Sequence, residues 1–79
     1  MHSENLVKMA NDIGNFFQAD PDKNQAVHNM VDHLKKFWDP RMRRAIIAHL
    51  REGGAGLSEL ARDAVRQLDE ESSSLASSG

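Results

Sequence analysis

The residues with the clearest potential for chemistry are four histidines, at positions 2, 28, 33 and 49. His28 and His33 lie five residues apart, about 140° around a helix, so they do not face one site as an i,i+4 zinc pair would. His49 falls on an apolar helical stripe, where we expect a hydrogen-bonded, partly buried imidazole rather than a ligand or general base. The 79-residue chain has no cysteine, which excludes a thiolate metal site and a disulfide.

The glycine-rich segment GGAG at 53–56 resembles a phosphate-binding loop only superficially. No strand is predicted before it, and no Lys-Ser/Thr pair follows it as the P-loop pattern requires. We interpret it as a flexible connector between two helices. No serine stands beside a placed base, so we expect a chain that is not an enzyme and has no catalytic, cofactor-binding or metal site of its own.

Apolar residues recur with the period of an α-helix in four segments, and no alternating run predicts a strand. We expect helices over residues 4–18, 20–38, 40–52 and 58–70. The expected N-caps are Ser3, Asp20, Asp39 and Ser58, with Pro21 and Pro40 in the first turns of their helices. The predicted fold class is all-α, a small compact bundle of about four short helices with a disordered C-terminal tail.

Residues 1–70 are predicted to form this single helical domain, and the polar, low-complexity residues 71–79 the disordered tail. The N-terminus lacks the basic start and apolar run of a signal peptide, and no apolar stretch approaches the length of a membrane span. We therefore expect a cytoplasmic protein.

The charge of the chain is unevenly distributed around a net value of −2. Residues 33–51 carry six bases and one acid, a net charge of +5, and both flanking segments are acidic. A solvated helix face, a nucleic-acid contact and a protein-docking surface are all compatible with such a basic band. The nucleic-acid alternative is a small helix-turn-helix protein that uses the basic band 33–51 on phosphates, although the acidic flanks would weaken its attraction to a polyanion.

Tryptophan and arginine are enriched at protein-binding hot spots, which favours docking for the centre of the basic band. Phe37 and Trp38 project about 100° apart on the predicted helix. We assign Phe37 to the core, with Met42 and Ile46, and Trp38 to a second surface. The side chains left unexplained by folding are then Trp38 and the arginines at 41, 43 and 44.

Two further observations extend the predicted contact beyond the basic band. Gly14 lies beside Val7 at the edge of an apolar stripe, where it either permits close packing of a helix within the domain or accepts an element of another protein. The chain also has more large apolar side chains than a small core can enclose, so we expect some of them to form an exposed apolar patch. Exposed apolar patches commonly mark an interface, and this one would allow the isolated chain to self-associate. The predicted partner-binding residues are Trp38, Arg41, Arg43, Arg44, Ile47, Val7 and Gly14.

Three segments resemble one known family. LVKMANDIGNFF at 6–17, HLKKFWDPRMR at 33–43 and GGAGL at 53–57 occur in the order and spacing of the delta subunit of soluble NAD-dependent formate dehydrogenases. The resemblance covers roughly residues 5–68, and its most specific portion consists of Phe37, Trp38, Pro40, Arg41, Met42 and Arg43. Leu57–Leu60 departs from the family, which often has a proline-containing turn before the last helix.

The resemblance implies a non-catalytic accessory subunit of a cytoplasmic formate dehydrogenase complex. Its partners would be the catalytic and diaphorase subunits, which hold the bis-pterin molybdenum or tungsten cofactor, iron–sulfur clusters, FMN and the NAD site. The implied role is to assist assembly, maturation or stability of the catalytic subunit through protein–protein contacts, with no cofactor in this chain. No membrane partner is implied, and nucleic acid is the disfavoured alternative.

Overall fold

The computed structural model describes the backbone of residues 3–78 and the side chains of residues 4–72. Within this part the chain forms four helices and no strand, which confirms the predicted all-α class. The helices are α1 (Ser3–Phe17), α2 (Lys23–Phe37), α3 (Pro40–Arg51) and α4 (Glu59–Ser78).

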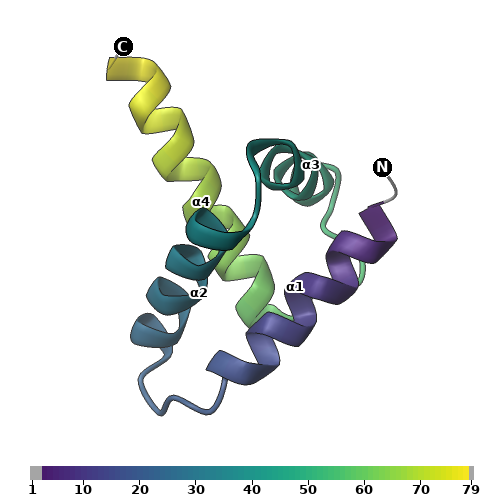
Figure 1. Ribbon diagram of the computed structural model, residues 1–79, viewed down its shortest axis with the longest axis vertical. Coiled ribbons are helices and arrows are strands. Elements are labelled where there is room, and N and C mark those ends of the chain that lie inside the picture. Colours follow the sequence, from purple (N-terminus) through teal and green to yellow (C-terminus); the bar gives the residue numbers. More distant parts are fainter. Residues whose placement is uncertain (1–2, 79) are drawn as a thin grey trace.

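Helix α4 is the element around which the other three are arranged (Figure 1). It contacts α1, α2 and α3, and its contact with α2 is the most extensive in the molecule. Helix α1 also packs on both α2 and α3. The largest fully buried side chains come from α2, α3 and α4: Met30, Leu34, Ile46 and Val65.

The predicted stop-and-start at Asp39-Pro40 is confirmed. The Asp39 carboxylate accepts a hydrogen bond from the Met42 backbone N–H at 2.9 Å, and Pro40 occupies the first turn of α3. Ser58 caps α4 in the same way, since its hydroxyl accepts from the Ala61 N–H at 3.2 Å. Ser3 is the first residue of α1, and its expected capping side chain lies outside the described side chains.

The predicted start of the second helix at Asp20-Pro21 is wrong by two residues. Asp22 is the N-cap of α2, with its carboxylate accepting from the Gln25 N–H, and Pro21 lies in the preceding turn. The Asp20 carboxylate instead accepts from the Asp22 N–H at 2.9 Å. Each of two aspartates two residues apart can accept a hydrogen bond from a backbone N–H further along the chain, and here the second aspartate is the one that caps the helix.

Helix α4 continues to Ser78, past residue 70, where we expect the domain to end. The division into a domain over 1–70 and a disordered tail over 71–79 stays a prediction. Residues 1, 2 and 79 lie outside the described backbone.

The glycine-rich segment connects α3 to α4, as predicted. Gly53, Gly54 and Gly56 all have positive φ angles, a conformation that side chains other than glycine rarely adopt. The connection is fastened to α1 by Asn11, whose amide Nδ2 donates to the Gly56 carbonyl at 2.9 Å. The Asn11 Oδ1 accepts from the Ser58 N–H, also at 2.9 Å. One side chain therefore satisfies two backbone groups more than forty residues away.

Ion pairs join α4 to its neighbours on the outside of the bundle. Lys35 of α2 pairs with Glu71, and Arg51 of α3 donates Nη2 and Nε to the two carboxylate oxygens of Asp69 at 2.6 and 3.1 Å. Surface pairs of this kind are screened by solvent and contribute little to stability. The Lys35 ammonium, and after it the Gln67 amide, hold the pKa of Glu71 below its usual value. Lys36 lowers the pKa of Asp32 in the same way.

Replacing Asn11 with alanine tests the connection to α1. Asn11→Ala leaves the Gly56 carbonyl and the Ser58 N–H without their partner, so the free energy of unfolding should fall by about 1–3 kcal/mol. Chemical denaturation followed by far-UV circular dichroism measures this change. Asn15→Ala is the matched control, because Asn15 is an exposed residue of the same helix with no hydrogen bond to the described side chains, and it should cost about 0.5 kcal/mol or less. If both variants lost the same free energy of unfolding, Asn11 would not be what fastens the connection to α1.

The Lys35–Glu71 pair predicts an acid limb of stability. Because the folded-state pKa of Glu71 is lowered, its contribution is complete above the ordinary glutamate pKa of 4.5 and is lost as the pH falls through the lowered value. Glu71→Gln should therefore flatten the decline of the denaturation midpoint below about pH 4.5. The exposed Glu70→Gln is the control, since Glu70 forms no ion pair within residues 4–72. An unchanged acid limb in Glu71→Gln would refute the linkage.

Candidate functional site

The corner between α2 and α3 reverses the expected roles of Phe37 and Trp38. Trp38 is only 5% exposed and belongs to the core, whereas Phe37 is 71% exposed. The assignment of Phe37 to the core is therefore wrong, and Trp38 is not left over for a second surface. The reason is that Trp38 is the C-cap of α2, with φ −94° and ψ 138°, so helical projection no longer gives the direction of its side chain.

Arg43 also has a structural explanation that the sequence did not reveal. Its Nη1 lies against three carbonyls at the C-terminus of α2, those of Lys35 at 3.2 Å, Leu34 at 3.5 Å and Trp38. The Leu34 carbonyl also accepts from the Trp38 N–H at 3.0 Å, whereas the carbonyls of Lys35 and Trp38 lie beyond this last backbone hydrogen bond of α2. A cation is also favoured there by the helix dipole. The half-buried Arg43 thus fixes the angle at which α3 leaves α2.

The other predicted arginines differ in their surroundings. Arg51 is engaged with Asp69, whereas Arg41 and Arg44 are exposed and form no ion pair with any described side chain. Arg44 lines a groove between α3 and α4 next to the buried Ile47. Lys35 and Lys36 are paired with acids. Three of the six bases in the band 33–51 are thus paired with acids, Arg43 lies on backbone carbonyls, and Arg41 and Arg44 have no ion pair within residues 4–72.

Gly14 and Val7 lie against other parts of the chain. Gly14 is buried where a Cβ would meet the Met30 sulfur and the Ser58 hydroxyl, each at 3.6 Å. The space in front of it is filled by α2 and α4, which corrects the interpretation that it accepts an element of another protein. Val7 is half-buried, with its Cγ1 near the backbone of Gly56. Both residues pack the interior of the domain.

The exposed apolar residues gather instead on α1 and on the α2–α3 corner. Met9, Phe16 and Phe37 are 42%, 75% and 71% exposed, although residues of these types are normally buried. Four half-buried residues connect them. We call this set the aromatic surface: Met9, Ile13, Phe16, Phe17, His33, Phe37 and Met42.

Ring contacts run through the aromatic surface in sequence. Phe16 and Phe17 meet edge to face with centroids 5.1 Å apart, and Phe17 meets His33 at 5.9 Å. His33 then lies 4.6 Å from Phe37, one helical turn further along α2. Aromatic rings in such edge-to-face and tilted arrangements gain about 0.5–1.5 kcal/mol per pair beyond the burial of their area. The rings therefore hold one another in place while their outer faces stay in water.

A groove crosses the aromatic surface between α1 and the α2–α3 corner. Its lining is predominantly apolar, with one carboxylate, and consists of Met9, Asp12, Ile13, His33, Phe37, Trp38 and Met42. Methionine is a flexible, polarizable side chain that adapts to different apolar partners. A groove of this composition suits a protein segment better than a small polar substrate.

The sequence contained a general indication of this surface but not its position. The expectation that large apolar side chains exceed the core is confirmed by the three exposed ones. Phe16 lies at the edge of the α1 stripe, about 100° from Phe17, so a helix that covers Phe17 leaves Phe16 outside. We expected Trp38 to contribute to the exposed surface, however, whereas in the structure Phe37 is exposed there and Trp38 is buried.

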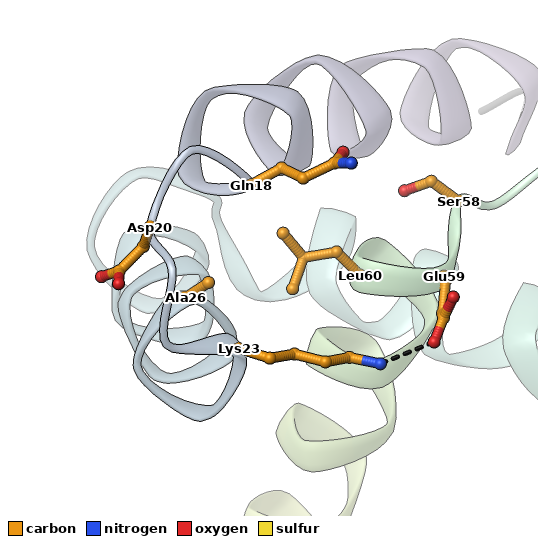
Figure 2. A pocket seen from close by; sticks show the side chains of 7 residues that line it. All are labelled: Gln18, Asp20, Lys23, Ala26, Ser58, Glu59 and Leu60. Carbon is orange, nitrogen blue, oxygen red and sulfur yellow. Dashed lines mark hydrogen bonds and ion pairs between the residues drawn. The ribbon is translucent and has the colours of Figure 1, made fainter.

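A second recess lies between the α1–α2 turn and the start of α4 (Figure 2). Leu60 projects into it from α4, and Lys23 spans its edge to reach Glu59 at 2.6 Å. The Ser58 hydroxyl is already engaged as the N-cap of α4. The charged groups at this recess therefore stabilise the α2–α4 contact.

The histidines do not assemble a reactive centre in the described part of the chain. His49 is half-buried, and its Nε2 lies 2.7 Å from the Ala55 carbonyl, which confirms the expected structural role. His28 is exposed on α2, away from His33. No group of three His, Cys, Asp or Glu side chains suited to a metal ion occurs among the described residues. None of the helices described is long and apolar enough to cross a membrane.

Comparison of the sequence with models of known protein families finds a match. The family model described as NADH-dependent formate dehydrogenase delta subunit FdsD matches residues 5–65. The matched span contains the whole aromatic surface, the α2–α3 corner and the glycine-rich connection. No curated protein and no solved structure matches the chain.

Two arginines one position apart provide a test of the α2–α3 corner. Arg43→Met keeps an apolar stem but removes the guanidinium from the carbonyls, so the free energy of unfolding should fall by about 1.5–3 kcal/mol, as for hydrogen bonds to a charged group. The exposed Arg44→Met should change it by about 0.5 kcal/mol or less. Denaturant titration of both variants measures the difference. If the two curves coincide, Arg43 does not hold the corner.

Proposed function

The chain belongs to the family of formate dehydrogenase delta subunits, and from that premise we propose that it is a non-catalytic accessory subunit. In this proposal it binds the catalytic subunit of a formate dehydrogenase complex through the aromatic surface and assists the assembly, maturation or stability of that subunit. The redox centres, namely the bis-pterin molybdenum or tungsten cofactor, the iron–sulfur clusters and FMN, together with the NAD site, belong to the catalytic and diaphorase subunits. The complex acts in the cytoplasm.

The observation that carries the proposal is the exposure of Met9, Phe16 and Phe37 on one continuous surface. Contiguous apolar patches on small proteins mark interaction sites. Complete burial of a large apolar side chain is worth about 1.5–3 kcal/mol, so the three together supply roughly 5–9 kcal/mol as an upper limit. Association costs an estimated 4–15 kcal/mol or more in lost freedom of motion. The aromatic surface therefore needs additional polar contacts to give a stable complex.

Two of the arginines are available to make those contacts. Arg41 and Arg44 are exposed on α3, and neither is held by a described acid. Arginine in this state binds carboxylates of a partner in a bidentate manner. Arg43 and Trp38 instead support the contact indirectly, because they set the corner from which Phe37 projects. Ile47 borders the Arg44 groove and extends the candidate contact toward α4.

Recovery of the complex from the native host tests the proposal. A tagged chain carrying Phe16→Ser and Phe37→Ser should capture the catalytic subunit at least about tenfold less than the wild type, because two anchors of an apolar contact are removed. The matched control is Asn15→Ser with His28→Ser, which changes exposed residues of the same two helices outside the aromatic surface.

The readouts are the amount of captured catalytic subunit and the formate:NAD activity of a host strain that expresses only the variant. Circular dichroism of each purified variant establishes that the helices are intact. Equal capture by the two double variants would show that the aromatic surface is not the contact. Full activity in a host lacking the chain would refute the accessory role itself.

A further inference from the structure

Two residues of opposite charge, one in the groove and one next to a groove residue in the sequence, have no ion pair among the described side chains. Asp12 lines the groove from α1, is exposed, and has no ion pair or hydrogen bond with the described side chains. Arg41 stands beside Met42 in the first turn of α3 and is equally unpaired within residues 4–72. Within residues 4–72, an unpaired carboxylate thus lines the groove from α1, and an unpaired arginine precedes the groove residue Met42 in the first turn of α3.

Such an arrangement is self-complementary. In a two-fold symmetric dimer, both copies use the same surface. If residue i of the first copy contacts residue j of the second, residue j of the first copy also contacts residue i of the second, so each contact occurs twice. A two-fold axis through the groove would exchange the α1 side and the α3 side. We propose that a second copy of this chain docks on the aromatic surface, with Asp12 of each protomer facing Arg41 of its partner.

His33 favours an occupant that brings an acceptor over a purely apolar one. Its ring is held between Phe17 and Phe37, and neither of its nitrogens has a hydrogen-bond partner among the described residues. An apolar cover would remove water from this imidazole and leave its N–H unsatisfied. A second copy brings acceptors of its own to the interface, among them the Asp12 carboxylate.

The size of the chain sets the expected strength of the dimer. The accessible surface is 5118 Å², and an interface of standard size takes about 800 Å² from each protein, which is about a sixth of this surface. The aromatic surface consists of the seven residues named above, fewer than the roughly 20–30 that each side of a standard interface contributes. The dimer should accordingly be weak and reversible, with a dissociation constant in roughly the micromolar range.

The proposed dimer does not rest on the accessory function. It concerns the isolated chain, so its failure and the failure of the proposed function are observed in different experiments. Where both hold, the second copy covers Phe16 and Phe37 until a larger partner displaces it. The free chain would then conceal the apolar patch that otherwise promotes aggregation.

Sedimentation of the purified chain over a concentration series is the first measurement. The wild type should shift from monomer to dimer with increasing concentration. Asp12→Arg and Arg41→Asp should each raise the dissociation constant by at least about tenfold, because each places like charges opposite one another twice in the dimer. Glu70→Arg, at an exposed position of α4 outside the aromatic surface, is the control and should leave the constant unchanged.

Mixing the two singly substituted chains gives the decisive result. The heterodimer of Asp12→Arg with Arg41→Asp has opposite charges at both contacts, so it should form with the affinity of the wild-type dimer although each variant alone dimerises at least about tenfold more weakly. Both positions are exposed and have no ion pair within residues 4–72, and circular dichroism checks that the variants are folded. A monomeric wild type at all concentrations, or variants that dimerise as the wild type does and gain nothing on mixing, would overturn the proposal.

Discussion

The contact of Arg43 with the end of α2 is the interaction on which the functional surface depends. The guanidinium lies on the carbonyls of Leu34, Lys35 and Trp38 at the C-terminus of α2, where the bond from the Trp38 N–H to the Leu34 carbonyl is the last backbone hydrogen bond of the helix. By holding these carbonyls it fixes the turn in which Trp38 leaves the helix and enters the core. Phe37, the last helical residue, is then directed outward with His33, and the aromatic surface follows from that geometry.

Much of the fold was predictable, because its signals are local. The Asp39-Pro40 and Ser58 caps, the glycine connector and the helical periods depend on residues within a few positions of one another, and the structure confirms them. The surface was not predictable to the same degree. A projection of 100° per residue holds only inside a helix, and Trp38 is the first residue beyond α2, so its direction depends on the tertiary packing. The roles of Arg43 and Asn11 are likewise set by backbone groups from other elements, which no spacing in the sequence reveals.

A chain of this size has little freedom to conceal apolar side chains. Small domains bury a smaller fraction of their surface than large ones, and the three helices packed around α4 enclose only part of the large residues present. The structure assigns the interior to compact aliphatic side chains and to Trp38, and leaves Phe16 and Phe37 outside. A surface of two phenylalanines and a methionine in water is unfavourable for the free chain. Any occupant that covers it stabilises the folded state in proportion to its affinity and concentration.

The distribution of ion pairs shows which helix such an occupant would affect most. Within the described residues, the pairs between helices connect α4 with α2 and with α3, through Lys23, Lys35 and Arg51. Helix α1 takes part in none of them and is held by apolar contacts and by the two hydrogen bonds of Asn11. Because α1 also carries Met9 and Phe16, a partner on the aromatic surface would join α1 to the α2–α3 corner at the place where the fold itself provides the fewest polar contacts. Binding and the stability of α1 are therefore coupled, so that the same groups that complete an interface also complete the fold.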